Sequence, residues 1–216
     1  MKPQIEILHH DQKILVVNKP AGISIHNAED DFNLMDLLKD HASELFPVHR
    51  LDKETSGIQL FALNSKSASE YALEFQNQNT LKIYVGLVRG QIKTQSGTWA
   101  QPLTDKSEGR QNPQGISAQR VPCKTTYDVI QSSKYFSFCR FHLHTGRQHQ
   151  IRKHAALNKH HLVGDSRYGD QKYNQKIAQL YQTDRMFLHC QDLHILGLQL
   201  HAPNPFDLSS LFKNIE

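Results

Sequence analysis

The stretch from Leu81 to Val88 constrains the fold most, because its apolar residues recur with a period of two. Its residues fall on two alternating faces, Leu81, Ile83, Val85 and Leu87 on one and Lys82, Tyr84 and Gly86 on the other. This alternation predicts a β-strand with one face turned to a core. Strand and helix patterns are interspersed along the chain without recurring parallel β-α-β units, which favours an α+β fold.

The other expected elements follow from periodicity and from turn residues. Further strands are expected at 5–8, 14–17, 48–52, 57–63, 121–130 and 135–143, with a hairpin at 188–200 broken at Gly197. Helices are expected near 33–45, from Ser65 as N-cap through Phe75, from Arg147 to about Leu157, and over 172–181. Residues 102–120 are rich in Gly, Pro, Gln and Ser, and we expect an exposed loop there.

Length, cysteine usage and charge narrow the class of protein. The 216 residues suffice for one substantial core or two closely packed subdomains. The three cysteines form no C-x-x-C pair, which favours a reducing compartment over a disulfide framework. No apolar run approaches the roughly 20 residues needed to span a bilayer, so we expect a cytoplasmic protein. The net charge of +4 allows a local basic face without requiring a nucleic-acid partner.

Residues suited to chemistry gather in a few blocks of the sequence. The first block is H-R-L-D-K-E-T-S-G at 49–57, and the second is K-I-Y-V-G-L-V at 82–88. The third is L-H-T-G-R-Q-H-Q-I-R at 143–152, which continues to G-D-S-R-Y-G at 164–169. N-K-P-A-G at 18–22 and the pair Leu188-His189 complete the set.

These blocks resemble the signature motifs of RluA-type RNA pseudouridine synthases. H-R-L-D-x-x-T-S-G is similar to the catalytic loop of that family, and the later blocks follow in the family's order from about residue 5 to about 205. The resemblance implies a single catalytic domain over 1–216, built on a long, mainly antiparallel central sheet with helices packed on it and a central active-site cleft. It also implies a compact form without a separate N-terminal RNA-binding domain.

The implied reaction isomerises specific uridines in structured RNA, either rRNA or tRNA, to pseudouridine. The C1′–N1 bond breaks, the detached uracil turns, and C5 is joined to C1′. Nothing is oxidised and no group is imported, so neither a metal nor an organic cofactor is expected. The expected partner is an RNA stem-loop, with no membrane and no protein partner inferred, and a monomer is expected.

The resemblance assigns catalytic roles to Asp52, Tyr84 and Arg152. Asp52 matches the family's catalytic aspartate, and Arg152 matches the arginine expected to pair with it. Tyr84 matches the tyrosine that stacks on the target base. Each has a structural alternative: a turn-capping aspartate, a half-buried strand tyrosine, and an arginine on a solvated helix face.

Substrate-binding roles are implied for Arg50, Ile151, Arg147 and His149. Arg50 matches an arginine that pushes the target nucleotide out of its stack, and Ile151 packs against the pocket. Residues 147–161 form the densest basic segment of the chain: Arg147, His149, Arg152, Lys153, His154, Lys159, His160 and His161. It is expected to be either a phosphate-contacting surface or a merely solvated helix.

The sequence departs from the family pattern at one place and leaves rivals open. Residues 159–163 read K-H-H-L-V, without the proline usual before G-D-x-x-Y-G, which leaves the local turn open. The fourteen histidines suggest a metal-binding site as one alternative, with His142, His144 and His149 as candidate ligands. No H-E-x-x-H or C-x-x-C motif accompanies them. A non-enzymatic RNA-binding protein on the same fold is the second rival. No G-x-S-x-G or P-loop motif occurs.

Overall fold

The structure is a computed structural model that describes residues 3–27, 30–106, 109 and 111–213. The chain divides into two compact units. The first comprises Met1–Lys82 and His189–Pro203, and the second comprises Ile83–Leu188 and Asn204–Glu216. Within the described ranges, no helix is both long enough and apolar enough to cross a membrane.

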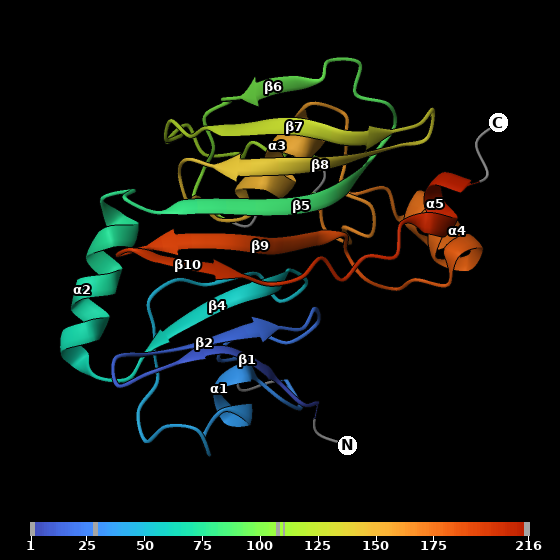
Figure 1. The fold of residues 1–216 in the computed structure, drawn as a ribbon. Helices are drawn as coiled ribbons and strands as arrows, with labels where there is room; N and C mark the ends of the chain where they lie inside the picture. The colour runs from blue at the N-terminus through green and yellow to red at the C-terminus, as the bar shows by residue number, and fades with distance from the viewer. Residues whose placement is uncertain (1–2, 28–29, 107–108, 110, 214–216) are drawn as a thin grey trace. The chain divides into compact units, whose positions relative to one another are not determined.

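Strands of the first unit pair mainly in antiparallel fashion (Figure 1). β1 (Glu6–His10) pairs with β2 (Ile14–Lys19), and β2 pairs with β4 (Ser56–Ala62). The short β3 (Phe46–Pro47) also pairs with β4. β9 (Leu188–Ile195) runs parallel to β4 through Ser56 and Gly57, and β10 (Leu198–His201) folds back antiparallel on β9. This confirms the predicted strands at 5–8, 14–17 and 57–63 and the predicted hairpin.

One buried cluster holds the first unit together. Apolar residues of β2 and β4 meet residues that follow the N-K-P-A-G turn: Leu15, Val17, Ile25, Leu34, Leu38 and Phe61. The alternation of Leu15 and Val17 along β2 therefore points one face of the strand into the cluster. α2 (Ser65–Gln76) covers the predicted helix after β4, but Asn64 is its N-cap, not Ser65, because the Asn64 side chain accepts from the Ser67 amide.

Two predictions for the first unit were wrong. The helix expected near 33–45 is only one turn, α1 (Leu34–Leu37), because Leu34 and Leu38 enter the core and the chain must then extend for Phe46 to pair with Ala62. The strand expected at 48–52 does not form. The Gln59 side chain donates to the His49 carbonyl and accepts from the Leu51 amide. These backbone groups are therefore not available to pair with a neighbouring strand.

The second unit contains an antiparallel meander. β5 (Leu81–Arg89, with Ile83 onward in this unit) pairs with β8 (Phe136–Leu143), β8 with β7 (Thr125–Ser132), and β7 with β6 (Ser96–Trp99). Figure 1 shows α3 (Gln150–Leu157) lying on one face of these strands. α4 (Gln171–Tyr181) and α5 (Ser209–Lys213) share one cluster with the strands, built around Val85, Leu87, Phe136, Phe138, Ile177, Phe206 and Leu211.

The second unit confirms most predicted elements and corrects others. β6 was not predicted, and β7 begins at Thr125 instead of Val121. α3 begins at Gln150 instead of Arg147, because His149 adopts a left-handed conformation with φ 54°. Residues 102–120 lack regular structure where described, as predicted, but Leu103, Thr104 and Gly115 are buried, so the segment is not simply an exposed loop.

The turn before the G-D-S-R-Y-G block forms without the missing proline. Gly164 has φ +80°, and a Cβ there would lie 2.2 Å from the carbonyl oxygen of Arg185. The predicted α+β class and mainly antiparallel pairing are confirmed. The central cleft and the single catalytic domain over 1–216 stay predictions.

Candidate functional site

The loop that carries Asp52 is fixed from its N-terminal side by Gln59 of β4. Gln59 has none of its surface exposed. Its Nε2 donates to the His49 carbonyl at 2.7 Å, and its Oε1 accepts from the Leu51 amide at 3.1 Å. These two bonds lie on either side of Arg50, whose side chain is exposed. A single side chain thus sets the backbone of the residues directly before Asp52.

The loop is fixed from its C-terminal side by the fully buried Lys19. The ammonium of Lys19 donates to the carbonyls of Pro20, Ile23 and Lys53 at 2.9, 2.8 and 3.1 Å. The Gly22 amide also donates to the Lys53 carbonyl at 2.8 Å. The N-K-P-A-G turn and the Asp52 loop are therefore bonded to each other. Asp52 itself is half-buried and accepts the Thr55 amide at its carbonyl, 3.1 Å away, in a tight turn.

His49 anchors the beginning of the same loop. Its ring stacks on Phe75 with centroids 4.7 Å apart, and its Nε2 accepts from the Leu60 amide at 3.0 Å. Burial, helped by the nearby charge of Lys82, lowers the pKa of His49 to about 3. His49 is therefore neutral at physiological pH, which is the form that can accept the Leu60 hydrogen bond through Nε2.

A buried serine and histidine hold the start of β4 against β9. Ser56 Oγ and His189 Nδ1 are 2.8 Å apart, and His189 Nε2 lies 3.2 Å from the Ala202 carbonyl. Because that carbonyl only accepts, the Nε2 carries the proton and Nδ1 accepts from the serine hydroxyl. His189 of the Leu188-His189 pair is thus bonded to Ser56, which lies in the H-R-L-D-K-E-T-S-G block.

Arg152 is an interior residue, with 1% of its surface exposed. Its Nε and Nη2 donate to the two carboxylate oxygens of Asp165 at 2.8 and 2.9 Å, and its guanidinium lies over the Tyr168 ring. Asp165 also accepts from the amides of Arg167 and Tyr168. Burial opposes ionisation of Asp165, but the bonds and charge of Arg152 outweigh it, so the pKa of Asp165 is lowered.

The two expectations for the basic segment were wrong for its central residues. Lys153 and His154 are fully buried, like Arg152. Lys153 Nζ donates to the carbonyls of Thr104 and Lys106, and His154 bridges Thr125 and Gln101. α3 is buried on every side from Gln150 to Ala156, so these side chains face the protein instead of solvent or phosphate.

The remaining substrate-binding candidates surround the start of α3. Ile151 is buried. Arg147 is partly exposed and its Nη1 donates to Asp105 at 3.0 Å. His149 Nδ1 lies 2.9 Å from the Tyr168 hydroxyl. The Gln150 side chain accepts from the Arg147 amide and the Thr145 hydroxyl and donates to the Lys124 carbonyl, which fixes the T-G-R turn.

Tyr84 lies on β5 opposite Phe141 of β8 and is 8% exposed. The alternation predicted one buried face for this strand, but all residues from Tyr84 to Val88 are buried. Gly86 matches this crowding, because a Cβ there would lie 2.8 Å from the Phe187 carbonyl oxygen. Burial on both faces leaves Tyr84 a largely enclosed tyrosine.

The predicted site residues are distributed over the two units. Asp52 and Arg50 belong to the first unit, whereas Tyr84, Arg147, His149, Ile151 and Arg152 belong to the second. The predicted pairing of Arg152 with Asp52 stays a prediction. The candidate metal histidines have different partners, His142 pairing with Asp128, His144 with Thr126 and His149 with Tyr168.

Sequence reasoning missed the residues that support the motif blocks. Gln59, Lys19 and Asp165 carry ordinary polar side chains, and only their burial distinguishes them. Lys19 and Asp165 lie inside the recognised N-K-P-A-G and G-D-S-R-Y-G blocks, which was the available signal. Gln59 lies in an apolar strand pattern, I-Q-L-F, where a single polar residue hints at a specific bonding role.

Comparison with known proteins decides the family. The model of the RNA pseudouridylate synthase family matches residues 13–157 of the chain.

The chain belongs to the RNA pseudouridylate synthase family.

Relatives of this family cover nearly the whole chain. The tRNA pseudouridine synthase C of Pasteurella multocida is 31% identical, covering 88% of this chain and 84% of the relative. The protein of the same name from Vibrio cholerae is 30% identical, covering 92% and 88%. The predicted family and the predicted class of enzyme, an isomerase, are therefore confirmed, and an enzyme is favoured over a non-enzymatic RNA-binding protein.

Solved structures of the family share the fold. Human RNA Pseudouridylate Synthase Domain Containing 1 superposes with a TM-score of 0.81 at 25% identity, covering 97% of this chain and 89% of the human one. Human RNA Pseudouridylate Synthase Domain Containing 4 gives a TM-score of 0.79 at 22% identity, covering 95% and 91%, and supports the fold alone.

Proposed function

We propose that this protein converts specific uridines of tRNA into pseudouridine and that Asp52 is its catalytic residue. The observation that carries the proposal is the double support of the Asp52 loop, by Gln59 before it and by Lys19 after it. Both supports are fully buried side chains, which a surface turn does not need. A loop held this rigidly suits a carboxylate that must be positioned against a ribose.

The chemistry needs little beyond positioned side chains. The C1′–N1 bond of the uridine breaks, the freed uracil turns, C5 bonds to C1′, and the proton leaves C5 while N1 gains one. Asp52 supplies the carboxylate for this exchange, and Tyr84 stacks on the uracil. Arg152, whose guanidinium is oriented by Asp165, supplies the positive charge. Neither a metal nor an organic cofactor takes part in these steps.

Substrate binding is proposed for side chains around the two motif loops. Arg50 displaces the target nucleotide from its stack, and Ile151 packs beside the displaced base. Arg147 and His149 contact the RNA strand near it. We propose tRNA over rRNA because the relatives covering most of this chain are named tRNA pseudouridine synthase C. The protein is further proposed to act as a monomer in the cytoplasm.

The decisive experiment measures pseudouridine formation by purified wild type and Asp52→Asn. Transcripts of tRNA and of rRNA are incubated with each protein, and modified positions are mapped by chemical labelling and reverse-transcription stops. Wild type should modify discrete tRNA positions, whereas Asp52→Asn should bind the same RNA and lose at least about a thousandfold in rate, because no carboxylate remains. Asp128→Asn, an exposed aspartate on β7, is the matched control and should keep full activity.

Each other result assigns a different function. Appreciable activity of Asp52→Asn removes Asp52 from its role. Modification of rRNA alone replaces the tRNA substrate. Wild type that binds RNA without modifying any uridine supports the non-enzymatic RNA-binding protein, and activity that chelator abolishes supports a metal-dependent enzyme.

A further inference from the structure

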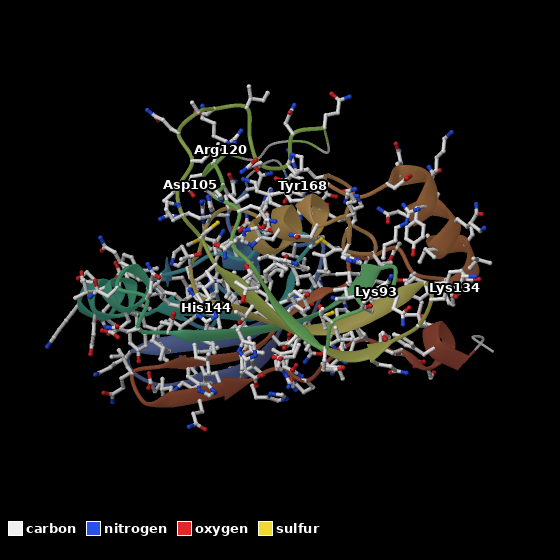
Figure 2. The ribbon with its side chains drawn as sticks, turned by 90° about the horizontal axis from the view of Figure 1, so that it is seen from above. Lys93, Asp105, Arg120, Lys134, His144 and Tyr168 are labelled. Carbon is white, nitrogen blue, oxygen red and sulfur yellow. The ribbon has the colours of Figure 1, made fainter. Side chains whose placement is uncertain are left out.

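Residues 102–120 form a segment of the second unit that we call the arm, of which 102–106, 109 and 111–120 are described. Its two ends are joined by a pair of backbone bonds between Leu103 and Val121, at 3.1 and 2.8 Å. The arm therefore leaves and re-enters the fold at one point. Figure 2 shows Asp105 and Arg120 on this segment, which rises past α3 and Tyr168.

The arm has a small packed interior of its own. Thr104 and Gly115 are buried, and a Cβ added to Gly115 would lie 2.2 Å from the Thr104 hydroxyl. The Thr104 amide donates to the Gln114 carbonyl, and Arg120 Nη2 donates to the Gly115 carbonyl at 3.1 Å. These contacts fold the described parts of the arm back on its base, so that its base has a defined shape.

Lys153 and Arg147 form hydrogen bonds to three consecutive residues at the base of the arm, 104–106. Lys153 Nζ donates to the Thr104 carbonyl at 2.8 Å and to the Lys106 carbonyl at 2.6 Å. Arg147 Nη1 donates to the Asp105 side chain between them at 3.0 Å. Lys153 has none of its surface exposed, so these carbonyls replace water around its ammonium.

The outer surface of the arm carries groups that suit RNA. The side chains of Lys106 and Arg120 are exposed, whereas Asp105 is already bonded to Arg147. Exposed amide side chains of Gln111, Asn112 and Gln119 accompany them. Cationic and amide side chains are the ones that contact phosphate and sugar in nucleic-acid complexes.

We propose that the arm binds the tRNA substrate and that Lys153 is the positioning residue that holds it for this purpose. Lys153 follows Arg152 directly on α3, so the helix that carries the proposed catalytic arginine also fixes the arm. Lys153 itself touches no substrate, because it is enclosed by protein. The inference rests on the proposed function and adds to it the surface by which substrate is gripped.

The test compares Lys153→Met with wild type in steady-state modification of a tRNA transcript. Methionine fills the space of the lysine stem but donates no hydrogen bond. KM for tRNA should rise about tenfold or more while kcat stays within about twofold, because the arm loses its position and the reacting groups do not. Trypsin should also cleave faster after Lys106 and Arg120. Lys172→Met, an exposed lysine on α4, is the matched control and should change neither measurement.

A second variant removes two exposed cations of the arm and leaves Lys153 in place. Lys106→Ala combined with Arg120→Ala should raise KM for tRNA and lower the salt dependence of tRNA binding, with kcat unchanged. If Lys153→Met does not fold, Lys153→Arg, which keeps the charge but moves the donors, takes its place with the same expected rise in KM.

Distinct results overturn the inference and the proposed function. An unchanged KM for the double variant removes the arm from the tRNA surface, and an unchanged KM and trypsin pattern for Lys153→Met removes Lys153 as its anchor. If wild type modifies no uridine, the proposed function fails. Binding of fluorescein-labelled tRNA to the same variants then decides on the arm by itself.

Discussion

The basic side chains of Lys19, Arg152 and Lys153 lie in the interior, each with 1% or less of its surface exposed. A buried cation is stable only when carbonyls or carboxylates replace its water. Lys19 and Lys153 donate to backbone carbonyls, and Arg152 donates to the Asp165 carboxylate. Each cation therefore fixes a particular piece of backbone or a particular turn in place. At the residue scale, these buried cations hold the loops and turns of the candidate site in place.

The Arg152–Asp165 pair gives a prediction at this scale. Asp165→Asn should lower the free energy of unfolding by about 3–5 kcal/mol, because it removes a carboxylate that is bonded twice to the buried guanidinium. The measurement is urea unfolding followed by circular dichroism. Asp128→Asn is the control, since its partner His142 and Asp128 itself are both partly exposed, and it should change stability by less than about 1 kcal/mol. Equal effects of the two substitutions would contradict the conclusion that Asp165 stabilises the fold by pairing with buried Arg152.

Among the elements, the close approach of β4 and β9 depends on Gly57. A Cβ there would lie 2.2 Å from the Cys190 carbonyl oxygen, and Gly57 has φ +112°. Gly57→Ala should therefore lower the free energy of unfolding by about 3 kcal/mol or more, through a clash with backbone and through strain. The pairing begins one residue earlier, at Ser56 and His189, so the loop that carries Asp52 should loosen as well.

Gly22→Ala is the matched control for this prediction. Gly22 also has positive φ, +85°, but nothing lies within 4 Å of an added Cβ. Only conformational strain remains, about 1–2 kcal/mol. Chemical denaturation of both variants at one pH compares them directly. A Gly57→Ala protein as stable as Gly22→Ala would show that β4 and β9 are not held this closely.

Periodic elements could be predicted from the sequence, whereas bonded loops could not. β5 and β8 carry regular alternation and were found, but β6, with the sequence S-G-T-W, is too short and too polar to show it. Residues 48–52 look like a strand, yet their backbone is bonded to Gln59, which no local pattern reveals. Arg152, Lys153 and His154 look solvated because their partners come from other segments of the chain.

Candidate site residues came from the motif blocks, not from their physical setting. Asp52 and Tyr84 were found through their neighbours in sequence, and neither is distinguished by composition. The support by Lys19, Gln59 and Asp165 comes from bonds between residues 8 to 34 positions apart, such as the bond from Lys19 to the Lys53 carbonyl. Such contacts are properties of the folded chain.

For the whole molecule, histidines with a lowered pKa predict sensitivity to mild acid. Burial lowers the pKa of His49 to about 3, with a smaller effect of Lys82, and burial also lowers the pKa of His154. An unfolded histidine titrates near 6.5. Below that pH the unfolded chain binds protons that the folded chain does not, so stability falls as pH falls from 6.5 towards 3.

Denaturant unfolding at pH 7.5 and pH 5.5 tests this acid sensitivity. Stability should fall by about 1–3 kcal/mol over this range, which is above the range where Asp and Glu titrate. In His49→Gln the fall should be smaller by about 1 kcal/mol, while exposed His26→Gln should leave it unchanged. A wild-type stability that stays flat between the two pH values would mean that these histidines are protonated in the folded protein.

The way each unit combines early and late segments of the sequence also affects folding during synthesis. β4, the strand that follows Asp52, lies early in the sequence, but its parallel neighbour β9 is made more than a hundred residues later. The second unit likewise needs Phe206 and Leu211, which follow β10 in the sequence. Neither unit can complete its core before these late segments have been made, so the nascent chain carries unpaired strand edges until then. The loop that carries Asp52 therefore reaches its final packing only after β9 has been made, long after the N-terminal segment that contains it.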